Sequence, residues 1–479
     1  MKKIISFALS SLMLTTVACS KTNEPDNTVR IPETPSEQSV QNMTRAMALV
    51  DRAIECYFEG SGMTMSRYYN PFTGTSPDEK ASVWMYGSSI EAVNAILRGL
   101  KTQQREGIPE LYDQHFQRYV DLLAQLYENA DYYLGTYTLT SFTQTRKWTV
   151  YGVNRGSDKG SAQVEGILNV YDDQQWLIRE FIEAYKLTGD KTYLEKAEYL
   201  TEYVLDGWDC TLNVDGDENG GIPWGPGYTT KHSCSNGPMV SPLVWLYEIY
   251  KGKDDQTTHR FIDIDKKRKS ETVKKSRYYL DFAKKVYDWQ KSTLLRSDGV
   301  YHDMRGGCVP NCDVAYEWVG GVRYRANTQL TRSEGEALSY NCGTMLSGAA
   351  DLYRVTRLGE YLEDFQQLSD ASFNYFGKLN QNVPGYYTYS VLGFNDWFNG
   401  VMMRGWVDGH KFYPSVSAPL ASFQANLDYA WSHFLRNGLL PTNLLVGWNQ
   451  DRGKNNVDGQ FIFAFAAEYA GLARYELEK

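Results

Sequence analysis

Apolar residues recur at helical spacing along most of this chain. From about Met43 to Tyr475, successive segments place them three or four positions apart with polar residues between. The C-terminal run 461–475 is apolar on most of its faces and is expected to be buried. Early examples are Met47, Val50, Ile54 and Tyr57, then Ile90, Val93, Leu97 and Leu100. The pattern predicts one mainly helical domain of roughly a dozen helices.

A weak internal repeat groups these helices into pairs. Residues 184–197 combine an aromatic helix end, the turn Thr188-Gly189-Asp190 and a second amphipathic segment, and residues 352–362 repeat this order. Each reads as an αα-hairpin. Six such hairpins closing into a ring would form an (α/α)6 toroid. An open solenoid built from the same unit is the alternative.

Three stretches depart from the helical pattern. Residues 135–153 and 383–392 mix Thr, Tyr and other β-formers with polar residues, so small β-hairpins decorating the rim are expected there. Residues 251–277 are polar and contain the basic run 266–269. We interpret this stretch as a solvated insertion.

The N-terminus has the features of an export signal. Lys2 and Lys3 precede a mostly apolar run over residues 4–14, and small residues lead to Cys19. This ending resembles the lipobox of bacterial lipoproteins. We therefore expect a signal peptide at 1–18, a lipidated flexible tether at 19–41 and a folded helical domain at 42–479, anchored through Cys19 to either face of the outer membrane. An ordinary cleaved signal is the alternative.

Composition and motif content argue against several classes of function. The net charge of -9 disfavours a nucleic-acid partner, which needs a basic face. Residues 213–224 begin like a calcium loop but lack its central Gly and final Glu. No zinc spacing, phosphate loop or Gly-x-Ser-x-Gly sequence is present, so no metal and no cofactor is predicted. Of the cysteines after Cys19, only Cys308 and Cys312 lie close in sequence.

Two adjacent acidic residues, Asp172 and Asp173, stand at the predicted start of a buried helix. Retaining hydrolysis of a glycosidic bond needs two carboxyl groups about 5 to 5.5 Å apart. Neighbouring α-carbons lie about 3.8 Å apart, so adjacent side chains can reach that separation. A helix cap is the competing interpretation, because Asp is favoured at an N-cap and in the first turn.

The loop from Gly207 to Trp224 is the richest in glycine and aromatic residues. Glycine lets the backbone approach a ligand closely, and Trp and Tyr offer flat apolar faces that suit the C–H face of a sugar ring. Trp208 and Trp224 are therefore candidate substrate contacts. Most of the other aromatic residues are expected in the core.

Several stretches, taken in order, resemble glycoside hydrolase family 76, the endo-α-1,6-mannanases. Asn169-Val170-Tyr171-Asp172-Asp173 with Trp176 resembles the family's catalytic motif, and the 207–224 loop follows it as expected. Tyr340-Asn341-Cys342-Gly343 and Phe398-Asn399-Gly400 with Arg404 resemble two further motifs. The resemblance covers nearly all of the chain after the expected tether.

The resemblance implies an (α/α)6 fold and endo-acting, retaining hydrolysis of α-1,6-mannan. It assigns Asp172 as the nucleophile and Asp173 as the general acid/base. Two departures, Cys342 for Gln and Asn399 for Lys, would change subsite preference if those positions touch substrate. The implied substrate-binding residues are Asn169, Trp176, Trp208, Trp224, Tyr340, Asn341 and Arg404.

Two other functions remain open at this point. The same fold could transfer the sugar to a hydroxyl acceptor, which would make the protein a transglycosylase. A lipoprotein that binds surface glycans without cleaving them would also use the tether, the aromatic residues and the helical repeats. The Asp172-Asp173 pair favours an enzyme. We expect a monomer acting on α-mannan.

Overall fold

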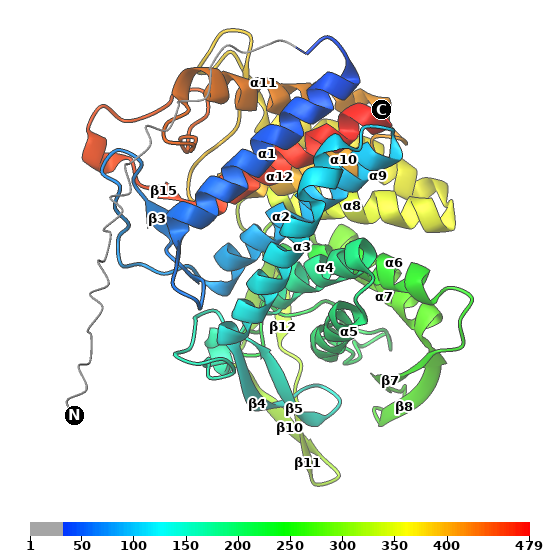
Figure 1. Cartoon of the computed structure of the whole chain (residues 1–479). Coiled ribbons are helices and arrows are strands. Elements are labelled where there is room, and N and C mark those ends of the chain that lie inside the picture. The colour runs from blue at the N-terminus through cyan, green and yellow to red at the C-terminus, as the bar shows by residue number, and fades with distance from the viewer. Residues whose placement is uncertain (1–31) are drawn as a thin grey trace, which may run out of the picture. The chain divides into compact units, whose positions relative to one another are not determined.

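Twelve α-helices dominate residues 32–479, the part of the chain that the computed structural model describes, and they alternate between an inner and an outer position (Figure 1). The inner helices are α2 (Val83–Arg105), α4 (Tyr171–Thr188), α6 (Gly237–Tyr250), α8 (Ser339–Thr356), α10 (Asn395–Gly409) and α12 (Gly459–Glu478). The outer helices are α1 (Pro35–Tyr57), α3 (Glu110–Ala130), α5 (Lys191–Asp206), α7 (Lys275–Leu294), α9 (Gly359–Phe376) and α11 (Ser417–Phe434).

The inner helices close into a ring. Each packs against the next inner helix in chain order, and α12 packs back against α2. The outer helices pack on the inner ones, as α5 does on α4 and α9 on α8. This closure confirms the predicted (α/α)6 toroid and contradicts the open solenoid. Inner helices are covered on nearly all sides, which explains the apolar run in α12.

The turn between α4 and α5 shows how each hairpin reverses. Gly189 ends α4 in the left-handed region at φ 79°, which glycine adopts without strain. Asp190 then begins α5, and its side chain accepts a hydrogen bond from the Thr192 N–H at 2.9 Å. Two residues therefore suffice to reverse the chain, as the sequence predicted.

Connections at the two ends of the ring differ in length. Most inner-to-outer connections are short, such as 189–190 and 357–358. All outer-to-inner connections are long: 58–82, 131–170, 207–236, 295–338, 377–394 and 435–458. The long loops therefore gather at the end where the inner helices begin. A binding site is expected there, because long irregular segments supply most functional side chains.

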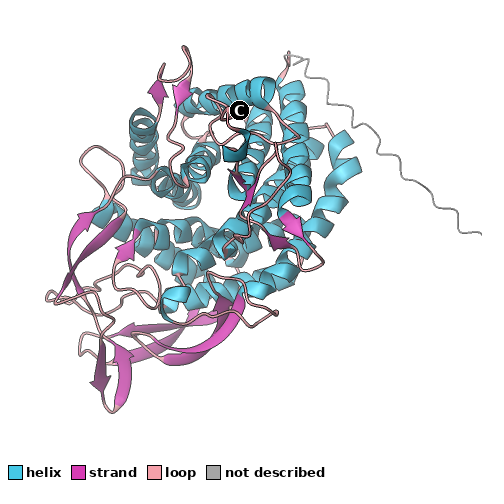
Figure 2. Ribbon diagram, turned by 90° about the vertical axis from the view of Figure 1, so that its left-hand side faces the viewer, coloured by secondary structure: helices cyan, strands magenta, loops and turns pink. Residues whose placement is uncertain are grey.

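These long loops also carry most of the strands, all paired antiparallel. The longer strands lie away from much of the helical ring (Figure 2). Strands in the long loops are β1 (Phe58–Glu59), β2 (Thr64–Met65), β3 (Tyr68–Tyr69), β4 (Leu134–Thr140), β5 (Thr145–Tyr151), β6 (Lys231–His232), β9 (Met304–Val309), β10 (Tyr316–Val319), β11 (Val322–Arg325), β12 (Gln329–Glu334), β13 (Lys378–Leu379), β14 (Tyr387–Thr388) and β15 (Val457–Asp458).

The three non-helical stretches have distinct outcomes. The hairpin expected at 135–153 is confirmed as β4 paired with β5. The region 383–392 contributes only the two-residue strand β14, paired with β13. The polar insertion 251–277 forms a largely exposed hairpin of β7 (Gln256–Ile262) and β8 (Arg268–Lys274).

The domain begins earlier than the sequence analysis placed it. Helix α1 starts at Pro35, inside the segment expected to be a tether, because Thr34 caps it and Ser39 and Asn42 are buried. The boundary at residue 42 is therefore wrong by about two helical turns. The signal peptide and Cys19 lie outside the described residues.

Cys308 and Cys312 form a disulfide. From residue 32 onward, the helices are too short or too polar to cross a bilayer.

Candidate active site

Asp172 and Asp173 occupy the second and third positions of α4, at the end of the ring where the long loops gather. The N-cap position is Val170, and no side chain caps this helix. Neither aspartate is therefore the N-cap. Asp173 is buried and Asp172 is partly exposed. Buried carboxyl groups without a cationic partner are costly, so this arrangement points to chemistry more than to helix stability.

The two carboxyl groups differ in acidity. Burial raises the pKa of Asp172 to about 6, and this rise is opposed by the Cys234 thiol, the Trp224 indole and the backbone N–H groups of Asp172 and Asp173. Burial, followed by the negative charge of Asp172, raises the pKa of Asp173 well above its ordinary value. Asp172 is thus the group that ionises first, while Asp173 keeps its proton.

The glycine-rich loop predicted from the sequence docks directly onto the start of α4. The Tyr171 N–H donates to the Trp224 carbonyl oxygen at 2.7 Å. A β-carbon at Gly225 would lie 2.4 Å from the Asn169 carbonyl oxygen, and one at Gly207 would lie 2.6 Å from the Tyr171 ring. Glycine is needed at both positions for this close approach. The loop thereby holds Trp224 next to the aspartate pair.

Aromatic side chains from the first turns of the inner helices form a cluster beside the pair. Trp176 and Trp397 meet edge to face with ring centroids 4.9 Å apart, and Tyr340 stacks on Phe398 at 4.2 Å. Trp84 contacts Trp397 at 5.4 Å. We call Trp84, Trp176, Tyr340, Trp397 and Phe398 the aromatic cluster. Burial raises the pKa of Tyr340 well above its ordinary value, and the negative charge of Asp172 adds to this rise.

Several polar atoms in this region lack a partner. Within residues 32–479, Trp84 Nε1, Asn341 Oδ1 and both polar atoms of the Asn169 side chain are buried and make no hydrogen bond. Buried polar groups are normally satisfied, so each unpartnered atom requires an explanation. A bound sugar, whose hydroxyls both donate and accept, would satisfy such groups.

The structure gathers only some of the predicted substrate contacts. Trp176, Trp224 and Tyr340 lie in or against one hydrophobic cluster with Cys234, close to the pair. Asn169 and Asn341 are fully buried behind them, and the Asn341 amide donates to Asp303 at 3.4 Å. Both asparagines hold buried polar atoms without a partner, so their predicted contact with substrate stays a prediction.

Trp208 does not join the aspartate pair. Its ring packs edge to face against Phe282 at 6.0 Å, and its indole N–H donates to Glu218 at 2.9 Å. Only 5 % of the residue is exposed. The prediction of substrate contact is therefore not supported for Trp208, because the loop that carries it folds this ring into the core.

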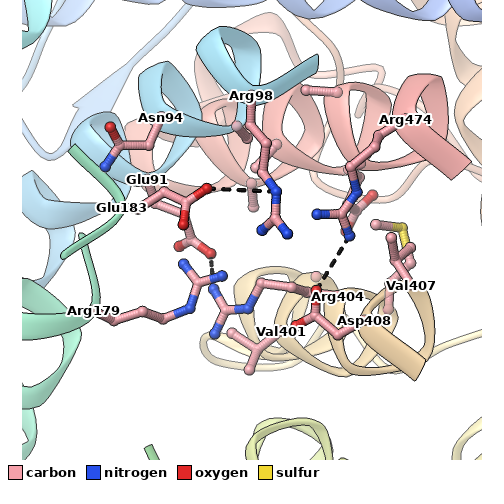
Figure 3. A pocket seen from close by; sticks show the side chains of 18 of the residues that line it. Glu91, Asn94, Arg98, Arg179, Glu183, Val401, Arg404, Val407, Asp408 and Arg474 are labelled. Carbon is pink, nitrogen blue, oxygen red and sulfur yellow. Dashed lines mark hydrogen bonds and ion pairs between the residues drawn. The ribbon is translucent and has the colours of Figure 1, made fainter. Parts of the chain in front are cut away.

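Arg404 also lies apart from the pair, in a cavity of about 60 Å³ inside the ring (Figure 3). The cavity is lined by α2, α4, α10 and α12, and four arginines enter it beside acidic partners. Arg404 pairs with Glu91, whose other oxygen accepts the Trp397 indole N–H at 3.0 Å. Arg404 therefore acts on the aromatic cluster through Glu91, whereas the sequence analysis placed it among the substrate-binding residues.

Replacing Arg404 by leucine is expected to destabilise the fold by about 3 to 5 kcal/mol, because it removes one partner of an ion pair in the interior. Urea unfolding measures this loss. Arg277→Leu is the matched control, since Arg277 pairs with Asp281 on the surface and such pairs contribute about 1 kcal/mol or less. A raised KM with unchanged stability would instead show that Arg404 contacts substrate.

Both departures from the family motifs lie in the interior. Cys342 is fully buried, and burial raises its pKa to about 12. Asn399 accepts from Ser339 Oγ at 2.8 Å and donates to the Ser390 carbonyl at 2.9 Å. Neither side chain is placed to contact substrate, so neither is expected to alter subsite preference directly.

The sequence analysis missed four residues near the pair. Tyr228 packs against Trp224, and Cys234 packs with Trp176 and Tyr340. Burial raises the pKa values of Tyr228 and Cys234, and the negative charge of Asp172 adds to both rises. Trp84 and Trp397 complete the aromatic cluster. A signal existed for the two tryptophans, because each stands at the beginning of an apolar helical segment.

No group of three or more potential metal ligands occurs in residues 32–479.

Comparison with known proteins adds to this geometry. A search of curated proteins finds no match. Among solved structures, glycoside hydrolase family 76 (mannosidase) Bt3792 from Bacteroides thetaiotaomicron is 21% identical, with a TM-score of 0.65 over 91% of this chain and 99% of that one. The GH76A alpha-1,6-mannanase from Salegentibacter sp. HEL1_6 is 18% identical, with a TM-score of 0.58 over 91% of this chain and 99% of that one.

Sequence comparison with protein families covers most of the domain. The model of glycosyl hydrolase family 76 matches residues 94–258 and 271–462, and the gap between the two ranges falls within the β7–β8 hairpin. The matched ranges include the aspartate pair, the glycine-rich loop and the aromatic cluster except Trp84. The chain belongs to glycosyl hydrolase family 76.

Proposed function

We propose that this protein hydrolyses α-1,6-mannosidic bonds within mannan, with retention of anomeric configuration. One observation carries the proposal: two adjacent carboxyl groups of unequal acidity stand at the start of an inner helix. The family supports glycoside hydrolysis. The linkage is supported by the Salegentibacter mannanase, of which an inactive variant with two consecutive aspartates replaced was solved with alpha-1,6-mannotriose.

The two aspartates take different roles. Asp172 ionises first, so its carboxylate attacks the anomeric carbon and forms a covalent glycosyl ester. Asp173 holds a proton and delivers it to the departing glycosidic oxygen. The backbone N–H groups of the first turn interact with the Asp172 carboxylate and keep it ionised.

The second half of the reaction uses the same residues. Formation of the ester removes the negative charge of Asp172, which had helped to raise the pKa of Asp173. Asp173 therefore becomes more acidic and accepts a proton from water. That water attacks the anomeric carbon from the face that the leaving group vacated, releases Asp172 and gives the retained anomer.

The decisive experiment is to incubate the protein with linear α-1,6-mannan and to measure the sizes of the products. An endo-acting enzyme gives a spread of oligosaccharides early in the reaction, and NMR of fresh products shows the α-anomer first. Release of mannose alone from the first minutes would contradict endo action, and a β-anomer would contradict retention. Absence of cleavage would favour a glycan-binding protein. Longer products at high acceptor concentration would identify a transglycosylase.

The rate should depend on pH in a bell-shaped manner. Below about pH 6 we expect kcat/KM to fall roughly tenfold per pH unit, because Asp172 becomes protonated and cannot attack. At higher pH, kcat/KM falls again as Asp173 loses its proton. The two apparent pKa values belong to the coupled pair. Steady-state rates on mannan between pH 4 and 10 would measure the profile.

An aryl mannoside with a good leaving group provides the control for this profile. Its glycosylation step needs no proton, so the alkaline limb should disappear while the acid limb remains. An acid limb near pH 3.9, the ordinary value for aspartate, would contradict the environment assigned to Asp172.

We also propose that the protein is exported and anchored through a lipidated Cys19, as the N-terminal sequence suggests. Cys19→Ala should then move the protein from the membrane fraction to the soluble fraction with its specific activity intact. Fractionation and mass spectrometry of the mature N-terminus test this prediction. A wild-type protein found soluble, without lipid mass, would contradict it.

A further inference from the structure

The hairpin formed by β10 and β11 exposes a large aromatic surface that the fold does not use. Strand pairing places Trp318 opposite Arg323 and Tyr316 opposite Arg325, so these side chains share one face. Trp318 is 72% exposed and Tyr316 is 40% exposed. Within residues 32–479, Trp318 has no ring partner and donates no hydrogen bond. The Arg323 guanidinium stacks over the Tyr316 ring at 3.7 Å.

On the opposite face of the hairpin, Val319 and Val322 near the turn are exposed, and Glu317 and Tyr324 contact the neighbouring β7–β8 hairpin. Glu317 forms an ion pair with Arg268 of β8, and the Arg268 guanidinium lies 4.3 Å from the centre of the Tyr324 ring. The β7–β8 hairpin therefore holds one side of β10–β11. On the other face, Arg325 at the base is buried, whereas Trp318 and Arg323 near the turn are exposed.

The base of the hairpin is bonded to the loop that approaches the aspartate pair. The Arg325 side chain is buried and donates to the carbonyl oxygens of Pro226, at 3.2 Å, and Tyr228. The same loop carries Trp224, whose carbonyl accepts the Tyr171 N–H. In Figure 1 the hairpin projects beyond β4 and β5 at the lower end of the view. The hairpin is thus linked by hydrogen bonds to the loop that contacts the start of α4, where the aspartate pair lies.

We propose that Tyr316, Trp318 and Arg323 form an accessory binding surface for a distant stretch of the polysaccharide chain that is cleaved at Asp172 and Asp173. The exposed Trp318 indole stacks on the C–H face of a pyranose ring, and the Arg323 guanidinium, which lies over the Tyr316 ring, donates to the sugar hydroxyls. Exposed apolar patches of this kind mark interaction sites. The proposal rests on the proposed hydrolysis of mannan.

Two other occupants fit the surface less well. An anionic membrane would be repelled by a chain of net charge -9, and this exposed surface offers one unpaired basic group, Arg323. A second copy of this chain would need roughly 800 Å² on each partner, which is more than a single four-residue strand pair presents. A polysaccharide chain needs only a narrow aromatic strip.

Trp318→Ala tests the proposal by comparing a long substrate with a short one. We expect KM for polymeric mannan to rise about three- to tenfold, the loss that follows removal of one stacking ring. KM for α-1,6-mannotetraose, a substrate of only four sugars, should stay within the error of the wild type. Binding to the polymer, measured by affinity electrophoresis in an Asp172→Asn background, should weaken by the same factor.

Tyr375→Ala is the matched control. Tyr375 lies on α9, is 37% exposed and has the Arg296 guanidinium 5.4 Å from its ring centre, yet it lies outside the β10–β11 hairpin. It should leave both KM values unchanged.

The outcomes separate this proposal from the proposed function. If the wild-type protein cleaves mannan and Trp318→Ala changes neither KM, or raises both equally, the accessory surface is refuted while hydrolysis stands. If the wild-type protein cleaves neither substrate, the proposed function itself fails. Loss of binding to phosphatidylglycerol vesicles, or of a dimer in sedimentation, with unchanged polymer kinetics would also overturn the polysaccharide proposal.

Discussion

Replacing Asp172 by asparagine is expected to reduce hydrolysis of mannan by a factor on the order of 10⁴ to 10⁶, the loss that removal of a covalent nucleophile causes in other enzymes. The amide cannot form the glycosyl ester, so an aryl mannoside with a good leaving group should be lost as well. Initial rates on both substrates measure the effect. External azide should not restore the configuration-retaining reaction, because no glycosyl-enzyme forms.

The same variant separates catalysis from helix capping. Burial raises the pKa of Asp172, so the folded protein binds this proton more tightly than the unfolded chain does. Stability associated with this group is therefore present at low pH and is lost as pH rises from about 4 through about 6. At pH 7 the neutral asparagine should leave Tm unchanged or raise it by a few degrees. A helix cap would show the opposite, a loss of about 1 kcal/mol with mild loss of activity.

Local signals in the sequence were sufficient for the aspartate pair and for the helical hairpins, whereas the closure of the hairpins into a ring was implied by the family resemblance. Asp172 and Asp173 are adjacent, so their meeting requires no tertiary information. The hairpin turn at Gly189 and Asp190 is likewise encoded by its own residues. Helical periodicity predicted roughly a dozen helices, because each helix must bury its apolar face against a neighbour.

The aromatic cluster was only partly predictable. The chain has 12 Trp and 36 Tyr, and most of them are core residues, so composition did not single out Trp84 or Trp397. The two tryptophans meet because α2 and α10 both pack against α12 in the closed ring. No local sequence pattern records this arrangement. Likewise, β3 pairs with β15 across almost the whole length of the chain.

Long-range ion pairs account for the misplacement of Arg404. Its position within a motif near the C-terminus suggested a substrate contact. The partner Glu91 lies on α2, far away in sequence, and the pair forms only because the ring closes α10 and α12 onto α2. Trp208 was misplaced for a related reason. Its loop folds back, so that its indole meets Glu218 and Phe282 in place of solvent.

Replacing Asp173 by alanine should affect the two half-reactions differently. On mannan the leaving alkoxide needs a proton, so we expect a loss of about 10² to 10⁴-fold. On an aryl mannoside whose phenol is a good leaving group, glycosylation needs no proton and should proceed through Asp172 at a rate close to that of the wild type. The intermediate should then accumulate, because no base activates water, and a burst of phenol should precede slow turnover.

Azide provides the sharpest test of this assignment. It is a strong nucleophile that needs no general base, and alanine at position 173 removes the carboxylate that would repel it. Azide should therefore accelerate steady-state turnover of the Asp173→Ala variant and give an α-mannosyl azide, the retained configuration. If Asp172→Ala were the variant that azide rescues with retention, the two roles would be exchanged. A β-mannosyl azide from Asp172→Ala would instead support the assignment, because it would arise by direct displacement in the space that the missing nucleophile leaves.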